Sequence, residues 1–302
     1  MKIGFVGLGH LGQHLAISLL RAGFLVIGYD LRQEAEASLI KAGGIWAASP
    51  KETAKLSDSV ITCLPSPAAV AAVISGDNGV LAGLTAGKTW IEMSTNDLHE
   101  VKRLAELAAV QGVNCLEAPV TGGVHKAAAG EITVLVGGDE AVYKLHIPVF
   151  QAMGDKVIYM GPLGSASVIK VITNMLAFIH LVGVGEALML AKQGGLDLGQ
   201  AFEAIKASSG NSFVHETESQ VILNGSYNIG FTMDLACKDL LLAHQLGREF
   251  GVPLELAGLV EQIFIRARAQ YGGNAWSSMV VKLLEDALGA ELRAPGFPEI
   301  LS

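Results

Sequence analysis

Short runs of apolar, β-branched and aromatic residues recur along the first half of the chain. They lie at residues 3–6, 25–29, 60–64, 90–93, 114–117, 133–136 and 157–160, and most are separated by segments with Ala, Leu, Lys and Glu at helical spacing. One helix start is well marked, because Ser49, Pro50 and Glu52 provide an N-cap, a proline at the first helical position and a capping-box glutamate. Strands that alternate with helices predict a mostly parallel sheet covered on both faces.

The pattern changes after residue 162. Residues 165–193 have no strand signal and are apolar on nearly every side, and at ~1.5 Å per residue such a helix would be roughly 40 Å long. The remainder is predicted to be helical, with glycine-containing turns between the helices. We therefore expect two domains, residues 1–162 and 163–302. A helix that is apolar all round must be enclosed by other helices or by a second subunit, so a homodimer or homotetramer is also expected.

The composition leaves room for two large cores and limits the kinds of partner. Of the 302 residues, 51% are hydrophobic and 17% are charged, and the 29 acidic residues outnumber the 21 basic ones, which argues against a nucleic-acid or anionic-membrane surface. The most membrane-like stretch, residues 171–185, is shorter than the ~20 residues of a membrane span, so we interpret it as a helix buried within protein. The three cysteines lack CxxC spacing, and glycines interrupt the N-terminus where a signal peptide needs an apolar core. A cytoplasmic protein with reduced thiols is expected.

The first glycine-rich turn is Gly7-Leu8-Gly9-His10-Leu11-Gly12. It follows an apolar strand, opens a helix and leads into a second strand, which is the context that the dinucleotide-binding fingerprint GxGxxG requires. Glycines let the backbone approach a pyrophosphate, and the helix N-terminus offers N–H groups and a partial positive charge. We therefore predict an α/β fold with an N-terminal Rossmann-type, doubly wound sheet, and these six residues as cofactor contacts. His10 and His14 are four residues apart, but no third ligand is evident nearby, so no metal site is predicted.

The second strand ends in Asp30, 18 residues past the last glycine of this turn. Its carboxylate can accept hydrogen bonds from both adenine-ribose hydroxyls and would repel a 2′-phosphate, so NAD is favoured over NADP. Arg32 qualifies this preference, since an arginine so close could partly accept that phosphate. Leu64, Pro65 and Thr95 follow the next two strands, and ligands bind at the carboxyl ends of strands in such sheets. These three residues are candidates to line the cofactor path, although ordinary loop residues would look the same.

A second glycine turn, Thr121-Gly122-Gly123, also follows a strand end. No helix of the dinucleotide-binding type is expected after it, and a threonine hydroxyl stands in place of a third glycine. Adjacent glycine N–H groups can form an anion-binding concavity and the hydroxyl adds a donor, which suits a carboxylate better than a diphosphate. A plain turn that needs positive φ would have the same sequence.

Two polar residues, Lys170 and Asn174, interrupt the long apolar helix near its start and share a face because they are one turn apart. An amine in an apolar cleft gives up its proton more readily, which suits it to exchange a proton with a substrate hydroxyl. The alternative is a lysine that extends to the surface, with Asn174 capping a neighbour. Lys238 and Asp239 interrupt a later helix in the same way. Lys238 could reach cofactor or substrate with Asp239 as its anchor, or the two could form an isolated surface ion pair.

Together these segments resemble the 3-hydroxyacid dehydrogenase family, over about residues 2 to 290. GFVGLGHLGQHLA is similar to the family's cofactor signature, APVTGG and GEITVLVGG to its substrate loop, GPLGSASVIKVITN to its catalytic-lysine segment and KDL to its C-terminal motif. The resemblance implies the family's fold, in which a long interdomain helix joins a dinucleotide-binding domain to an all-α domain that forms the oligomer.

The resemblance also implies roles for individual residues. Lys170 matches the catalytic lysine, Asn174 the asparagine near it, and Thr121-Gly122-Gly123 a Ser-Gly-Gly that binds the substrate carboxylate. The residues that match cofactor contacts are Leu64, Pro65, Thr95 and Lys238, and Lys238 is also expected to reach the substrate.

Some positions depart from the family's pattern. Thr121 replaces a serine, which keeps the hydroxyl but adds a methyl group that narrows the pocket. Ala275 and Trp276 stand where an aspartate is expected, and Trp276 could cover the substrate instead. His125 and Lys126, just beyond the glycine pair, could enlarge the positive character of the pocket.

We therefore predict NAD-dependent interconversion of a small 3-hydroxy carboxylate and its semialdehyde by hydride transfer. Lys170 would exchange the hydroxyl proton, Thr121-Gly122-Gly123 would hold the carboxylate of this small anionic substrate, and Asn174 would orient it. One alternative is an imine reductase-like enzyme on the same scaffold, which Lys170 disfavours because the resemblance implies that such enzymes usually lack this lysine. The other is a catalytically silent NAD-binding protein, favoured only by the missing aspartate near Trp276.

Overall fold

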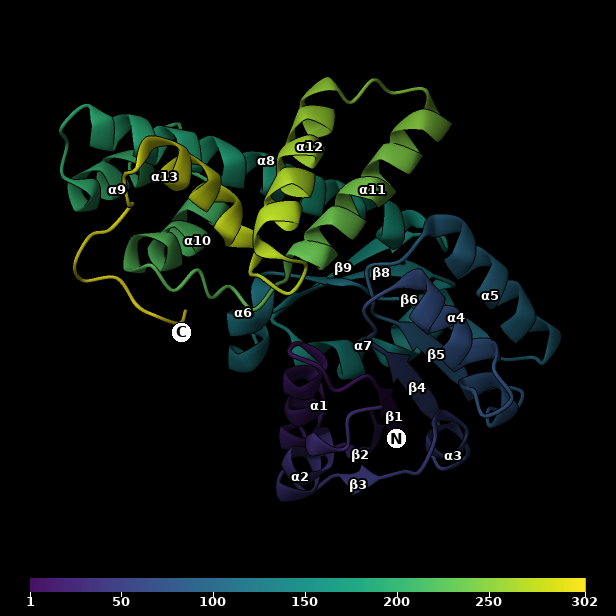
Figure 1. Ribbon diagram of the computed structural model, residues 1–302. Helices are drawn as coiled ribbons and strands as arrows, with labels where there is room; N and C mark the ends of the chain where they lie inside the picture. The colour runs from purple at the N-terminus through teal and green to yellow at the C-terminus, as the bar shows by residue number, and fades with distance from the viewer. Residues whose placement is uncertain (302) are drawn as a thin grey trace. The chain divides into compact units, whose positions relative to one another are not determined.

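The computed structural model describes residues 1–301 (Figure 1). The chain divides into two compact units, Met1–Lys170 and Val171–Ser302. The long helix α8 (Ser165–Gln193) runs across this division, so its first turns belong to the first unit. The sequence pattern places the division earlier, after residue 162, because that is where the strand signal stops.

A single nine-stranded sheet forms the centre of the first unit. Its strands are β1 (Lys2–Val6), β2 (Leu25–Tyr29), β3 (Ile45–Trp46), β4 (Ser59–Thr62), β5 (Thr89–Glu92), β6 (Asn114–Glu117), β7 (Val120–Thr121), β8 (Thr133–Gly138) and β9 (Lys156–Gly161). Each of the seven apolar runs in the sequence corresponds to one of them, and the ends differ by at most two residues. The strands β3 and β7 were not predicted, because two residues are too few to show a pattern.

Most strand pairs are parallel. The order β3-β2-β1-β4-β5-β6 is parallel throughout, whereas β8 runs antiparallel to both β6 and β7, and β9 pairs with β8 in parallel. The predicted fold class, an α/β Rossmann-type sheet followed by an all-α part, is confirmed. The antiparallel pairing of β8 with β6 and β7 is the part that strand–helix alternation does not predict.

Helices cover both faces of this sheet. They are α1 (Gly12–Arg21), α2 (Glu34–Lys41), α3 (Pro50–Lys55), α4 (Pro67–Ser75), α5 (Leu98–Val110), α6 (Gly123–Ala129) and α7 (Glu140–Met153), with a 3-10 turn η1 at Val80–Ala82. Successive strand residues alternate between two cores, so Phe5 and Ile61 pack with α1 and α7 while Val6 and Val60 pack with α4 and α5. This double burial explains why the strands are apolar throughout.

The marked helix start at α3 is confirmed. The Ser49 hydroxyl accepts a hydrogen bond from the Glu52 N–H (3.1 Å), and Pro50 is the first helical residue. The Glu52 carboxylate accepts from the Ala48 N–H (2.6 Å) rather than from that of Ser49, so this bond is displaced by one residue from the usual capping box.

The second unit, in its described part, consists of helices. After α8 come α9 (Leu198–Lys206), α10 (Phe213–Asn224), α11 (Met233–Phe250), α12 (Glu255–Tyr271), the 3-10 turn η2 (Ser277–Val281) and α13 (Lys282–Leu288). Helices α11 and α12 lie side by side as a hairpin (Figure 1). The core of this unit gathers around buried residues of α8 such as Leu181 and Leu188, which pack with Phe202 and Phe264.

Helix α8 is apolar along most of its length. Among residues 1–301 it alone is long and apolar enough to cross a membrane by length and composition, a test that core helices of soluble proteins also pass. We predicted that it would be buried within protein. In the single chain, however, Ile172, Leu176 and Leu190 remain exposed, and only 33% of its most apolar window is buried. Within one chain, that prediction therefore holds only in part.

Candidate functional site

The carboxyl ends of four parallel strands lie side by side along one end of the sheet. Val6 pairs in register with Thr62, Thr62 with Glu92, and Glu92 with Glu117, so β1, β4, β5 and β6 end side by side. The loops that follow carry most of the predicted site residues of this unit, namely Gly7 to Gly12, Leu64, Pro65, Thr95 and, shortly after β6, Thr121 to Gly123. Two of these loops are directly bonded, because the Leu64 N–H donates to the Ser94 hydroxyl (2.8 Å).

The first glycine turn is closely packed at two of its glycines and open at the third. Gly7 has φ +100°, and a Cβ atom there would lie 2.2 Å from the Cys63 carbonyl oxygen. A Cβ atom at Gly12 would lie 2.0 Å from the Gly7 oxygen. At Gly9, in contrast, the nearest atom is the Arg32 Nη2 at 3.7 Å. A ligand can therefore approach the backbone at Gly9, just before α1 begins.

Asp30 joins this turn to the end of β2. Its carboxylate accepts hydrogen bonds from the Leu8 N–H (2.7 Å) and the Arg32 N–H (2.8 Å). The Arg32 guanidinium lies back over the same turn, with Nε 3.3 Å from Asp30 Oδ1 and Nη2 3.3 Å from the Leu8 oxygen. An open backbone at Gly9, a helix start and a carboxylate at the end of β2 together fit a dinucleotide.

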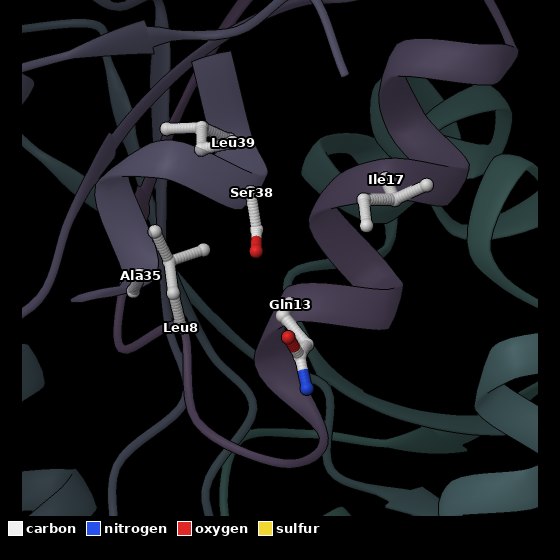
Figure 2. Close-up of a pocket in the computed structure, with 6 residues that line it drawn as sticks. All are labelled: Leu8, Gln13, Ile17, Ala35, Ser38 and Leu39. Carbon is white, nitrogen blue, oxygen red and sulfur yellow. The ribbon is translucent and has the colours of Figure 1, made fainter. Parts of the chain in front are cut away.

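A small hollow beside this turn lies between α1 and α2 (Figure 2). It is partly open to solvent and is lined by Leu8, Gln13, Ile17, Ala35, Ser38 and Leu39. Of the predicted site residues only Leu8 lines it. Its lining is largely apolar and holds no ionisable side chain, so we do not assign the reaction to it.

The second glycine turn requires both of its glycines. Gly122 has φ +125° and Gly123 φ +85°, and side chains rarely adopt such conformations. The expectation that no dinucleotide-type helix follows needs qualification, because the seven-residue helix α6 begins at Gly123. Lys126 on this helix pairs with Glu131 (2.5 Å), so its charge is offset. Burial, followed by the charge of Lys126, lowers the pKa of His125. The expected gain in positive charge beside this turn is therefore small.

Two buried glutamates at the edge of the sheet were missed in the sequence. Glu92 is 1% exposed and accepts hydrogen bonds from the Ser94 N–H (2.8 Å) and the Thr62 hydroxyl. Burial raises its pKa to about 7, and the neighbouring Glu117 adds to the effect. Glu117 is 0% exposed, and burial raises its pKa as well. The sequence does contain a signal for this pair, because a glutamate is the last residue of two successive strands, β5 and β6.

Lys170 is the last residue of the first unit and lies in the second turn of α8, where 8% of it is exposed. The start of this helix is bonded to the sheet, because the N–H groups of Gly164, Ala166 and Ser167 all donate to the Glu117 carboxylate. The lysine is thus held by the unit that carries both glycine turns.

In the second unit, Asn174, Lys238 and Asp239 form a connected group. The Asn174 side-chain amide donates to Asp239 Oδ2 (2.6 Å), and Lys238 Nζ lies 2.8 Å from Asp239 Oδ1. Asp239 is completely buried, so the alternative of an isolated surface pair is wrong. Asp239 anchors both predicted site residues of this unit.

The departure at Ala275 and Trp276 has a structural role. The Ala275 carbonyl accepts a hydrogen bond from the Met233 N–H (2.7 Å), and Trp276 forms an isolated antiparallel β-bridge with Thr232. Trp276 also packs against the core of the second unit. This packing gives the aromatic side chain of Trp276 a place in the structure of the second unit.

Both parts of the chain match known protein families. Residues 2–161 match the NAD-binding domain of 6-phosphogluconate dehydrogenase, and residues 164–284 match the NAD-binding family of NADP-dependent 3-hydroxyisobutyrate dehydrogenase. The chain belongs to the 3-hydroxyacid dehydrogenase family. It is therefore of the oxidoreductase class and contains an NAD(P)-binding domain.

The similarity to individual relatives extends over nearly the whole chain. It is 34% identical to 2-(hydroxymethyl)glutarate dehydrogenase of Eubacterium barkeri, covering 97% of each chain. It is 35% identical to L-threonate dehydrogenase of Cupriavidus necator, covering 93% of this chain and 95% of the other. A crystal structure of 3-hydroxyisobutyrate dehydrogenase from Salmonella typhimurium superposes with a TM-score of 0.87 at 32% identity, covering 94% of this chain and 99% of that one.

Replacing Gly9 by alanine tests the open side of the first turn. We expect the Gly9→Ala variant to keep its free energy of unfolding within about 0.5 kcal/mol, because the added methyl group meets no protein atom closer than the Arg32 side chain. The same methyl group would occupy the approach of a pyrophosphate, so the Kd for NADH should rise at least about tenfold, measured by fluorescence titration. Gly183→Ala, where a Cβ atom also has open space, serves as the control with unchanged affinity. Unchanged NADH affinity in Gly9→Ala would contradict this placement.

Stability should depend on pH through Glu92. Its pKa is raised from 4.5 to about 7 in the folded state, so its protonated form favours folding. This contribution is complete below about pH 4.5 and is lost as the pH rises through about 7, which corresponds to a loss on the order of 2–3 kcal/mol. The Glu92→Gln variant, a neutral isostere of the protonated acid, should lose less stability between pH 5 and pH 8 in urea unfolding. An equal loss in both proteins would show that Glu92 is not the group responsible.

Proposed function

We propose that this protein interconverts a small 3-hydroxy carboxylate and its semialdehyde, with NAD as the preferred cofactor and Lys170 as the general acid/base. The observation that carries the proposal is a mostly buried lysine at the start of α8, held by the same unit as the dinucleotide-type turn. Such a turn and a tuned proton-transfer group are what hydride-transfer chemistry requires of the protein.

The predicted roles divide among the residues as follows. Gly7, Leu8, Gly9, His10, Leu11 and Gly12 hold the pyrophosphate, and Asp30, Leu64, Pro65, Thr95 and Lys238 contact the rest of the cofactor. Thr121, Gly122 and Gly123 bind the substrate carboxylate through N–H groups and a hydroxyl. Asn174 orients the substrate, supported by its hydrogen bond to Asp239, and Lys238 contacts both substrate and cofactor.

The proton balance of the step is simple. In oxidation, Lys170 takes the proton of the substrate hydroxyl as the C–H bond breaks. A bound nicotinamide cofactor would supply the acceptor for the hydride of that carbon, so the products would be the semialdehyde and the reduced cofactor. In reduction Lys170 returns the proton to the developing alkoxide. The remaining residues hold the reacting atoms in place, which is the main contribution of a protein to cofactor chemistry.

The substrate class rests on the relatives and on the second glycine turn. Relatives named for 2-(hydroxymethyl)glutarate and L-threonate bear hydroxylated carboxylates in their names. We therefore propose a small anionic hydroxyacid or semialdehyde as the substrate. The free thiols of Cys63, Cys115 and Cys237 support a cytoplasmic location, and the exposed apolar residues of α8 support a homodimer or homotetramer.

A panel assay tests the reaction. Purified protein is mixed with NAD⁺ and, in turn, 3-hydroxyisobutyrate, glycerate, threonate, serine and a cyclic amine, and NADH is followed by absorbance. We expect turnover with at least one hydroxyacid, lowered ~10²–10⁴-fold in Lys170→Ala because general acid–base catalysis is lost. A Lys170→Ala enzyme that keeps more than about a tenth of wild-type turnover would contradict the role of the lysine. Oxidation of the cyclic amine alone would instead favour an imine reductase.

The cofactor preference is tested at Asp30. We expect the wild-type protein to have at least about tenfold higher kcat/KM with NAD⁺ than with NADP⁺, because the carboxylate would lie against the 2′-phosphate. In Asp30→Asn the side-chain oxygen can still accept from the Leu8 N–H, so the turn is retained while the charge is removed. The ratio of the two kcat/KM values should then move toward one. A ratio that is unchanged, or higher activity with NADP⁺ in the wild-type protein, would overturn the preference.

A further inference from the structure

The start of α8 is bound by a single carboxylate from the sheet. Glu117 Oε1 accepts hydrogen bonds from the N–H groups of Gly164 (2.7 Å) and Ala166 (2.7 Å). Glu117 Oε2 accepts from the Ser167 N–H (3.1 Å) and from the Ser167 hydroxyl. All these donors belong to residues at the first turn of the helix, and the acceptor lies at least 47 residues earlier in the chain.

A carboxylate is well suited to this position. The first N–H groups of a helix have no partner within the helix, and the N-terminus carries a partial positive charge. Glu117 satisfies several of these donors at once, which is how a completely buried carboxylate keeps hydrogen-bond partners. Because β6 ends at Glu117, the helix start is fixed to the end of the sheet where the first glycine turn and the segment leading to the second glycine turn begin.

The surrounding backbone makes room for this carboxylate. Gly137 of β8 pairs with Glu117 in the sheet, and a Cβ atom on Gly137 would lie 2.3 Å from Glu117 Oε1. Gly164, which donates to the same oxygen, has φ +103°. The absence of a side chain at Gly137 therefore leaves the space that the Glu117 carboxylate occupies. This explains a glycine in the VGG segment that neither cofactor nor substrate binding accounts for.

Lys170 follows directly on the helix face that Glu117 holds. It lies four residues after Ala166 and three after Ser167, which places all three on one face of α8. Helical side chains also lean toward the N-terminus, so Lys170 extends over the turn that Glu117 binds. A change in the position of this turn therefore shifts the lysine.

We infer that Glu117 is a positioning residue, which sets the location of the Lys170 amine by holding the first turn of α8 against the end of β6. The inference deepens the proposed function and rests on the role given there to Lys170. Glu117 itself touches no reacting atom. Its effect on the rate arises because a reacting group misplaced by about 1 Å can cost on the order of 10²-fold in turnover.

The chain provides a matched control in Glu92. This glutamate pairs with Glu117 in register on the neighbouring strand and is equally buried. Its oxygens bind the Ser94 N–H and the Thr62 hydroxyl instead of α8. The same substitution, glutamate to glutamine, can therefore be made at both positions with only one of them bonded to the helix start.

The test is a double-mutant cycle with the hydroxyacid that gives the highest turnover in the panel. In Glu117→Gln an amide group replaces one acceptor facing the helix N–H groups, so we expect kcat to fall at least about tenfold while the KM for the hydroxyacid changes less than about threefold. Adding Glu117→Gln to Lys170→Ala should lower kcat by less than about twofold further, since a residue that acts through the lysine has no effect without it. In the cycle with Glu92→Gln, the two effects should multiply. Multiplying effects in the Glu117 cycle, or wild-type kcat in Glu117→Gln, would overturn the inference.

Amide hydrogen exchange of the protein without cofactor gives a measurement that does not depend on activity. Glu117→Gln should lose protection over residues 164–170, and Glu92→Gln should retain it. Retained protection in Glu117→Gln would overturn the inference. Because exchange does not depend on activity, this measurement still tests the inference if Lys170→Ala keeps full activity and the proposed function fails. If Glu117→Gln does not fold, Ser167→Ala removes one donor only and should lower kcat about threefold, again without a further effect in Lys170→Ala. Wild-type kcat in a folded Ser167→Ala protein would then count against the inference.

Discussion

In-register parallel pairing of β1, β4, β5 and β6 is the constraint on which the candidate site depends. Because these strands end side by side, four segments begin at the same end of the sheet. They are the first glycine turn, the two loops with the predicted cofactor contacts, and the segment that leads to the second glycine turn. The strands are held in this register by burial on both faces, since a shift by one residue would exchange the residues of the two cores. Packing of the strand residues in the two cores therefore decides which polar groups lie together at the carboxyl ends of the strands.

The same burial forces the polar groups at this edge to be satisfied within the protein. Glu92 and Glu117 are the last residues of neighbouring strands, and both are almost completely buried. Nearby hydroxyl and N–H groups donate hydrogen bonds to each of them, which offsets the cost of burying their oxygen atoms. For Glu92 the donors are the Thr62 hydroxyl at the end of β4 and the Ser94 N–H in the loop after β5, and for Glu117 they come from the start of α8. The raised pKa of each carboxyl group reflects the cost of keeping a charge in this environment.

Local patterns predicted much of this structure, and distant contacts explain the rest. The strands, the first glycine turn and the cap at Ser49 depend on residues close in sequence, so periodicity and spacing reveal them. The strands β3 and β7 are too short to give a pattern. The sequence also could not tell that Gly9 faces open space while Gly12 is packed against the Gly7 backbone, nor that Gly137 makes room for Glu117. Such contacts join segments that only the folded chain brings together.

Helix α8 carries two anchors within a few residues, and they belong to different units. Lys170 lies at the end of the first unit, in the turn after the one that Glu117 bonds to the sheet. Asn174, one turn later, is bonded to Asp239 of the second unit. The lysine proposed to transfer the proton is thereby positioned by the unit that contains the NAD(P)-binding domain, and the residue proposed to orient the substrate is bonded to the helical unit.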